Sequence, residues 1–366
     1  MIFHKKLLAI DTAQQPQFNI RSQYTIHCEE NCEERHQALR GSIPCRLLRG
    51  PLSSVVMADL RHITEAQQFD RQALVDIFRV SREMEQVAQH YGSNILNRRV
   101  MASLFYEPST RTRLSFESAM RRLGGDVITT ESAQEFSSAA KGETLEDTIR
   151  IVGGYADLIV LRHFESGASR RAAAVSQVPI ISAGDGPGQH PTQALLDVYT
   201  IERELGQIDG ISIALVGDLA NGRTARSLCY LLTKFDDVRV HFVAPEVVRM
   251  HDDIKEYLTR NGVHWEESTD LPKVASQVDV IYQTRIQRER FGDRIQDFQL
   301  AKGKFIIDQR ILDCMSDRAI IMHPLPRVDE INAEEVDSDP RAAYFRQAHN
   351  GLYVRMALLR MILANS

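Results

Sequence analysis

The sequence predicts an α/β protein made of two doubly wound domains whose sheets are mainly parallel. Short apolar runs alternate with segments in which apolar residues recur at helical spacing, a pattern typical of strand–helix–strand units. The 366 residues suit two domains of ordinary size, and a hydrophobic content of 43% can fill their cores. Nearly every unusual polar cluster follows an apolar run, and ligands of parallel sheets bind at the carboxyl ends of strands. We therefore expect one composite site.

The predicted elements alternate from residue 70 onward. An amphipathic helix is predicted over residues 70–91, with Leu74, Ile77 and Met84 on its apolar face. Apolar runs predict strands at residues 100–105, 157–161, 178–182, 211–217, 239–243, 278–282, 304–307 and 319–322. Further helices are predicted after Pro108, at residues 143–149, from Pro191, and over residues 342–363.

A domain boundary is predicted near residues 204–210, where a helix ends and a turn with glycine and aspartate precedes the next strand. The first domain is predicted over residues 58–205 and the second over residues 206–341. The C-terminal helix, residues 342–366, is expected to complete the first domain. Residues 1–57 lack sustained periodicity and are expected to form an extension that is disordered or serves in targeting.

Charge and cysteine content narrow the class of protein. A net charge of -5 gives no sign of a nucleic-acid-binding surface, and no apolar run is long enough to cross a membrane. The five cysteines are odd in number and scattered, which is typical of reduced thiols rather than a disulfide framework. The cytoplasm is the expected compartment, with a plastid as the alternative if residues 1–57 act as a transit peptide.

The sequence Glu-Pro-Ser-Thr-Arg-Thr-Arg, which follows the first predicted strand, is suited to binding a phosphate. A helix begins after Pro108, so Ser109 falls near the N-cap and Thr110, Arg111 and Thr112 in the first turn. Unpaired N–H groups and the positive end of the helix dipole attract an anion there, and hydroxyls and a guanidinium add donors. The structural alternative is a capped helix with a solvated basic edge. It leaves unexplained why two arginines stand where they oppose the dipole.

Two other strand ends carry candidate residues. Arg162 directly follows a predicted buried strand, where a charge needs either an anionic ligand or a structural carboxylate. His190 follows a glycine-rich loop and precedes the helix that begins at Pro191. The positive end of that helix opposes protonation, which suits an imidazole that donates a hydrogen bond to a carbonyl group.

Arg223 and Arg285 each stand at a turn from strand to helix, and Gln287 lies beside the second of them. Two arginines near a phosphate site indicate a co-substrate with two carboxylates. The turn before Arg223 superficially resembles a dinucleotide turn, but its glycines do not give G-x-G-x-x-G.

Lys141 is expected to bring positive charge to a ligand from a polar loop. Its spacing from Ser138 matches that of Ser/Lys acyl-enzymes, but their companion motifs are missing.

Taken together, these motifs resemble those of the carbamoyltransferase family. Ser109-Thr-Arg-Thr-Arg113 and His190-Pro-Thr-Gln193 are similar to the family signature, and His323-Pro-Leu-Pro326 is similar to its aspartate branch. The ornithine branch carries H-C-L-P and an S-M-G loop, and neither occurs in this sequence. Arg285-Ile-Gln287 and Lys141-Gly-Glu143 also match the aspartate branch. The resemblance covers about residues 60–363 and is strongest to plant-type members.

The resemblance implies a carbamoyltransferase fold in which residues 58–205 bind carbamoyl phosphate and residues 206–341 bind aspartate. It assigns carbamoyl phosphate binding to Ser109, Thr110, Arg111, Thr112, Arg162, His190, Gln193 and the main chain of Leu325 and Pro326. It assigns aspartate binding to Ser137, Lys141, Arg223, Thr224, Arg285 and Gln287. Arg111, Thr112, Arg162 and His190 are implied to be catalytic, and the Leu325–Pro326 bond is implied to be cis. In the family, Ser137 and Lys141 reach the site from the neighbouring subunit of a homotrimer.

The implied reaction transfers the carbamoyl group of carbamoyl phosphate to the α-amine of L-aspartate in pyrimidine biosynthesis. Arg111, Arg162 and His190 polarise the carbonyl, so the reaction requires neither a cofactor nor a metal. The resemblance leaves open whether a regulatory subunit binds or a nucleotide inhibits, and it implies no nucleic-acid or membrane partner. A catalytically silent subunit is the alternative from another class. The complete set of cationic residues argues against it.

Overall fold

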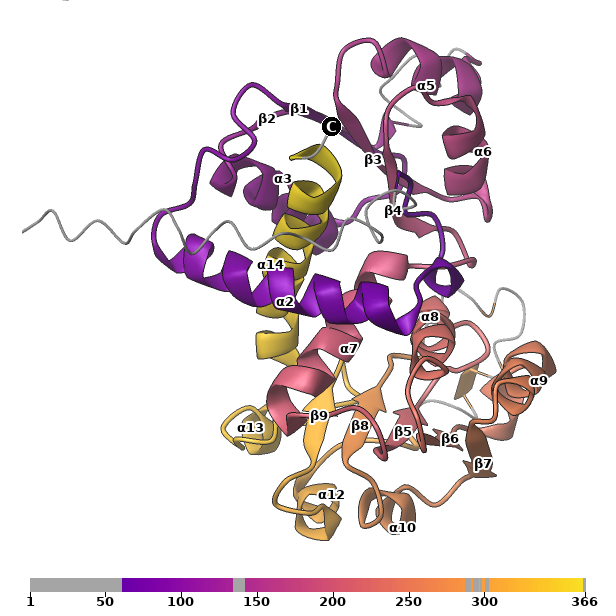
Figure 1. Cartoon of the computed structure of the whole chain (residues 1–366). Helices are drawn as coiled ribbons and strands as arrows, with labels where there is room; N and C mark the ends of the chain where they lie inside the picture. Colours follow the sequence, from indigo (N-terminus) through magenta and orange to yellow (C-terminus); the bar gives the residue numbers. More distant parts are fainter. Residues whose placement is uncertain are drawn as a thin grey trace, which may run out of the picture. The chain divides into compact units, whose positions relative to one another are not determined.

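The computed structural model describes residues 61–133, 142–286, 291, 296, 298–299 and 303–364. These residues form two parallel sheets with helices packed against them (Figure 1). The first sheet has the strand order β2-β1-β3-β4, and the second has the order β7-β6-β5-β8-β9. Every strand pair in both sheets is parallel. The predicted fold class of two doubly wound α/β domains is confirmed.

The elements follow one another in the alternating order that the sequence predicts. The strands are β1 (Val100–Phe105), β2 (Asp126–Glu131), β3 (Leu158–His163), β4 (Ile180–Asp185), β5 (Ser212–Val216), β6 (Arg239–Val243), β7 (His264–Ser268), β8 (Val280–Gln283) and β9 (Ile320–Met322). The helices are η1 (Ala66–Gln68), α2 (Arg71–Gln89), α3 (Thr110–Arg122), α5 (Leu145–Val152), α6 (Ala168–Val175), α7 (Pro191–Leu205), α8 (Arg223–Leu232), η3 (Glu246–Val248), α9 (Asp252–Arg260), α10 (Leu271–Ala275), α12 (Gln309–Cys314), α13 (Ala333–Val336) and α14 (Tyr344–Leu363). No helix in this described part of the chain is long and apolar enough to cross a membrane.

The predictions failed where strands are exposed or very short. Strands β2 and β7 were missed because they lie at the sheet edges, where most of their side chains are at least partly exposed and give no apolar run. The strand predicted at residues 304–307 is wrong, since only Ile307 pairs there, in an isolated bridge with Ile331. That apolar segment is instead buried in the core of the second sheet.

The core beside the first sheet joins alternate residues of β1 and β3 to two helices. Ala102, Ile159 and Leu161 pack with Leu145 and Ile149 of α5 and with the buried alanines of α6, Ala168 and Ala172. In the second sheet the equivalent core lies under α10 and α12. These cores hold the strands rigidly and leave the loops at their carboxyl ends to form a binding site.

The C-terminal helix α14 packs against α2, α3 and α7, which all precede the second sheet in the sequence (Figure 1). Val354, Leu358 and Leu359 of α14 are buried, as expected for a helix enclosed by neighbours. Ion pairs at its two ends, Arg346 with Glu204 and Arg360 with Glu83, join it to α7 and α2. The chain thus returns, after completing the second sheet, to helices that precede that sheet in the sequence.

Two glycines with positive φ, one in the loop after β4 and one at the end of α7, differ in the space around them. Gly186 has φ +50°, and a Cβ atom there would stand 2.0 Å from the carbonyl oxygen of Phe164. Gly206 has φ +80°, but nothing within the described structure lies within 4 Å of its Cβ position. Gly206→Ala should therefore lower the free energy of unfolding by about 1–2 kcal/mol, the cost of the left-handed conformation. Gly186→Ala should lower it by at least about 3 kcal/mol, because the clash with backbone is added. Urea unfolding curves of the two variants measure the difference, and equal losses would contradict it.

Candidate active site

A pocket of about 1050 Å³ lies where segments from both sheets meet. Its walls come from the residues after β1, β4, β5, β8 and β9, from the end of β3 and from α14. Every candidate residue in the described part of the chain lines it: Ser109, Thr110, Arg111, Thr112, Arg162, His190, Gln193, Arg223, Thr224, Arg285, Leu325 and Pro326. Ser137, Lys141 and Gln287 lie outside the described residues. One pocket thus brings together polar clusters from both halves of the sequence.

The N-terminus of α3 opens directly into this pocket. Ser109 is the N-cap, and within the described structure its hydroxyl caps none of the helix N–H groups. Arg111 is solvent accessible on the pocket wall, and partial burial lowers the pKa of its guanidinium. Arg113 instead forms an ion pair with Glu131 at 2.8 Å and approaches Glu117 at 3.8 Å. Of the two arginines in the first turn, one is therefore a ligand candidate and the other is held by carboxylates.

Of the two partners that the sequence left as alternatives, the structure gives Arg162 a structural carboxylate, and the guanidinium also lines the pocket in which an anion would bind. Arg162 stands inside β3, which extends two residues beyond the predicted strand, and donates from Nη1 to the Ala183 carbonyl at 3.1 Å. Its Nη2 lies 3.3 Å from Oε2 of Glu107, and the guanidinium also lines the pocket. The same Glu107 oxygen lies 3.9 Å from Nη1 of Arg223. Sequence reasoning missed Glu107 as a functional residue, although it stands two residues before the N-cap of α3.

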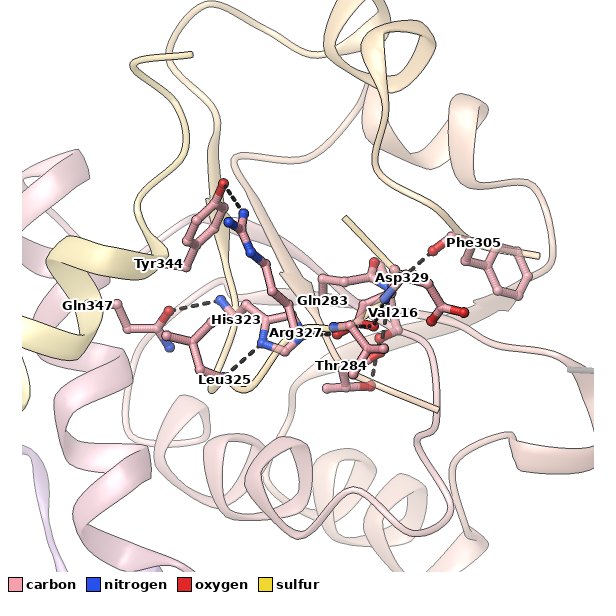
Figure 2. Close-up of polar contacts among 12 residues, drawn as sticks. Val216, Gln283, Thr284, Phe305, His323, Leu325, Arg327, Asp329, Tyr344 and Gln347 are labelled. Atoms are coloured by element: carbon pink, nitrogen blue, oxygen red, sulfur yellow. Dashed lines mark hydrogen bonds and ion pairs between the residues drawn. The ribbon is translucent and has the colours of Figure 1, made fainter. Parts of the chain in front are cut away.

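Arg223 is the first residue of α8, and its guanidinium is oriented by the loop after β4. Its Nη1 donates to the carbonyl of Gly186 at 2.6 Å. Thr224 follows it in the helix, and Arg285 reaches the same pocket from the end of β8. Thr284 anchors that strand end, because both its N–H and its Oγ1 donate to the Val216 carbonyl at 2.8 Å (Figure 2).

His190 is the N-cap of α7 and is almost wholly buried. Burial lowers the pKa of its imidazole well below the usual value, and the positive charges of Arg223, Arg162 and Arg355 lower it further. Its backbone N–H donates to Oγ of Ser227 at 3.0 Å, while Nδ1 has no hydrogen-bond partner among the residues described. The imidazole is therefore neutral at physiological pH, with one ring nitrogen able to donate and the other to accept.

This buried neutral imidazole predicts a pH dependence of stability. Above pH 6.5 His190 is neutral in both states, but below it only the unfolded chain takes up the proton. The free energy of unfolding should therefore fall as the pH drops. His190→Asn removes this contribution, so its stability relative to the parent should rise by about 1 kcal/mol between pH 6.5 and 5.5. Urea unfolding of both proteins at pH 7.5, 6.5 and 5.5 measures the difference. A difference that stays constant with pH would contradict the assignment.

Gln193 lies in the first turn of α7, and a buried carboxylate fixes its amide. Its Nε2 donates to Oδ1 of Asp197 at 2.8 Å. The hydrogen-bond network therefore turns Nε2 toward Asp197 and leaves Oε1 as the acceptor on the pocket side. Burial raises the pKa of Asp197 to about 7, against the opposing effect of its hydrogen-bond donors and Arg355.

The loop after β9 carries a cis peptide bond between Leu325 and Pro326, as the resemblance implied. His323 organises this loop: its Nδ1 accepts from the Leu325 N–H at 2.7 Å, and its Nε2 lies 2.7 Å from Oε1 of Glu330 (Figure 2). The His323 N–H donates to Oε1 of Gln347 in α14 at 2.8 Å. Because the Leu325 N–H is engaged inside the loop, the groups that the loop offers to a ligand are its main-chain carbonyls.

Comparisons with known proteins agree with this arrangement. The family model of the aspartate/ornithine carbamoyltransferase carbamoyl-P binding domain matches residues 61–203, and that of the Asp/Orn binding domain matches residues 209–362. The chain is 64% identical over 334 residues to chloroplastic aspartate carbamoyltransferase of Oryza sativa subsp. japonica, covering 89% of this chain and 91% of the relative. It is also 64% identical to the chloroplastic enzyme of Arabidopsis thaliana, over 88% of this chain and 83% of that protein.

Solved structures give the same assignment. The catalytic subunit of M. jannaschii aspartate transcarbamoylase superposes with a TM-score of 0.78 at 47% identity, covering 84% of this chain and 99% of that one. Aspartate transcarbamoylase from Trypanosoma cruzi, in complex with N-(phosphonacetyl)-L-aspartic acid, also gives a TM-score of 0.78, at 42% identity over 83% of this chain and 96% of that one. With its sheets, its pocket and both family models in agreement, the chain belongs to the aspartate carbamoyltransferase family.

Proposed function

We propose that the pocket transfers the carbamoyl group of carbamoyl phosphate to the α-amine of L-aspartate, giving N-carbamoyl-L-aspartate and phosphate for pyrimidine biosynthesis. The observation that carries this assignment is that cationic side chains from both halves of the chain line one pocket: Arg111 and Arg162 from the first half, and Arg223 and Arg285 from the second. Such a pocket fits two anionic substrates held side by side.

Carbamoyl phosphate is placed against the first domain. The helix N–H groups of α3, the hydroxyls of Ser109, Thr110 and Thr112, and Arg111 bind its phosphate. Its carbonyl oxygen accepts hydrogen bonds from Thr112, Arg162 and the neutral imidazole of His190. Its amino group donates to Oε1 of Gln193 and to the main-chain carbonyls of Leu325 and Pro326. The proposal thus gives each group of carbamoyl phosphate a donor or acceptor among the residues that line the pocket.

Catalysis follows from the charge that develops during attack. When the neutral amine of aspartate adds to the carbonyl carbon, negative charge moves to the carbonyl oxygen, where Arg111, Arg162 and His190 stabilise it. A neutral His190 serves this purpose as a donor, and its low pKa keeps it from competing with the amine for a proton. The tetrahedral intermediate then collapses: the bond between its carbon and the phosphate oxygen breaks, and the proton lost by the amine nitrogen leaves with the phosphate.

Aspartate is placed against the second domain, with Arg223, Thr224, Arg285 and Gln287 binding its carboxylates. Ser137 and Lys141 are proposed to reach the site from the neighbouring subunit of a homotrimer. A regulatory subunit or a nucleotide inhibitor would act on that assembly. The chloroplastic names of the rice and Arabidopsis relatives favour the plastid over the cytoplasm as the compartment of this chain, with residues 1–57 as its targeting segment.

The test is an assay of the purified full chain, without partners, with carbamoyl phosphate and either aspartate or ornithine. Carbamoyl-aspartate and phosphate formed in a one-to-one ratio would support the proposal and show that the chain suffices. Activity with ornithine alone would overturn the assignment of Arg223 and Arg285 to two carboxylates. A folded chain that is inactive with both amines would favour a catalytically silent subunit.

A further inference from the structure

Asp197 is a fully buried carboxylate in the middle of α7 that the mechanism above does not use directly. It accepts three hydrogen bonds from three different parts of the chain. Oδ1 accepts from Nε2 of Gln193 at 2.8 Å and from Nε2 of Gln347 at 2.7 Å, and Oδ2 accepts from the hydroxyl of Tyr282 at 2.8 Å. A buried carboxylate is costly unless such donors satisfy it, so its surroundings are built for it.

The first of these contacts decides what Gln193 offers to the pocket. Asp197 stands four residues after Gln193, one turn along the same face of α7. Oδ1 of Asp197 accepts the hydrogen bond from Nε2 of Gln193, so Asp197 holds the NH₂ group of Gln193 and leaves Oε1 turned away from itself. A free glutamine amide can rotate and present either end. With Asp197 in place, the pocket receives an acceptor, which is what the NH₂ group of a carbamoyl substrate requires.

The other two contacts reach the remaining walls of the pocket. Gln347 of α14 donates to Asp197. It also accepts the N–H of His323, which begins the loop with the cis peptide bond (Figure 2). Tyr282 lies in β8, three residues before Arg285. A single carboxylate is therefore hydrogen-bonded, directly or through one side chain, to the elements that carry both predicted substrate sites.

We propose that Asp197 is a positioning residue for the reaction, one that fixes the amide of Gln193 as an acceptor for the carbamoyl amino group. This inference rests on the proposed function of the pocket and adds to it a residue that touches neither substrate. Because its action passes through Gln193, the two residues should be energetically coupled in catalysis. A carboxylate that serves only to hold α7, α14 and β8 together would instead affect stability and leave that coupling near zero.

The test is a double-mutant cycle with the full chain: the parent, Asp197→Ala, Gln193→Ala and the double variant. We expect Asp197→Ala to lower kcat/KM for carbamoyl phosphate on the order of 10–100-fold, the cost of a misplaced substrate contact. The double variant should be little worse than Gln193→Ala alone. If the loss of kcat/KM in the double variant equals the product of the losses in the two single variants, the residues are not coupled and the proposal is overturned. An Asp197→Ala variant that melts at a lower temperature but keeps the parent kcat/KM would also overturn it.

Thr200→Val is the matched control. Thr200 is also buried in α7, one turn beyond Leu196, and its Oγ1 accepts a hydrogen bond from Asn350 of α14 at 3.0 Å. The variant should lose stability but keep its kcat/KM, because this contact joins the same two helices without reaching Gln193. If Asp197→Ala does not fold, Asp197→Leu, which fills a similar volume and has no acceptor for Gln193, takes its place in the cycle with the same expected coupling. A parent chain that transfers no carbamoyl group refutes the proposed function itself. If the parent is active but the effects of the two substitutions on kcat/KM are independent of each other, only the role of Asp197 is refuted.

Discussion

Arg111→Ala should lower kcat/KM for carbamoyl transfer about 10²–10³-fold while leaving the free energy of unfolding nearly unchanged. Arg111 stands in the first turn of α3 with its guanidinium on the pocket wall. Removing one such donor to a developing oxyanion costs roughly 3–4 kcal/mol of transition-state stabilisation. The fold should not suffer, because a cation in the first turn opposes the helix dipole and its removal relieves that cost.

Steady-state kinetics at saturating aspartate, together with urea unfolding, measure these two effects separately. Arg121→Ala is the matched control, since it makes the same change at an exposed position near the other end of α3. Its kcat/KM should equal that of the parent. Near-normal turnover of Arg111→Ala would defeat the proposed role of Arg111 in binding the phosphate and the oxyanion.

Much of the fold could be predicted because its central strands are buried on both faces. Strands β1 and β6 span the residues expected from their apolar runs, and both lie inside their sheets. The edge strands β2 and β7 could not be predicted in this way. Their backbones pair on one side only and their side chains are largely exposed, so the sequence contains too little apolar signal to distinguish them from loops.

The residues around the pocket were predictable for a related reason. Parallel sheets place the carboxyl ends of their strands together, so polar clusters that follow successive strands meet in one place. Arg162 and Arg285 are far apart in the sequence but line the same pocket. The sequence does not predict which of the cationic side chains are available to bind a ligand and which form ion pairs within the protein. Arg113 has the same residue type and nearly the same position as Arg111, and only the distance to Glu131 shows that it is held by the protein.

The supporting residues were missed because their partners are distant in the sequence. Asp197 lies 150 residues from Gln347 and 85 residues from Tyr282. A buried aspartate on a helix face gives no local signal beyond its spacing from Gln193. Glu107 similarly stands beside a motif, but its function depends on Arg162 and Arg223, which other strands supply.

Arg285→Ala should lower kcat/KM for aspartate about 10²–10⁴-fold, because two charge-assisted hydrogen bonds to a carboxylate contribute roughly 3–6 kcal/mol. The affinity for carbamoyl phosphate, measured by calorimetry, should stay the same, since Arg285 follows β8 and the phosphate ligands follow β1. Arg318→Ala is the control in the same half of the chain: it is exposed and should keep full activity.

Arg285→Lys separates charge from geometry. Lysine keeps the positive charge but loses the planar fork that binds a carboxylate with two parallel hydrogen bonds. We therefore expect its kcat/KM for aspartate to lie between those of Arg285→Ala and the parent. If Arg285→Lys matches the parent, Arg285 acts as a point charge and does not bind the carboxylate through a bidentate contact. If even Arg285→Ala keeps the parent's KM for aspartate, the second carboxylate must bind elsewhere in the pocket, and the two-arginine basis for preferring aspartate over ornithine fails.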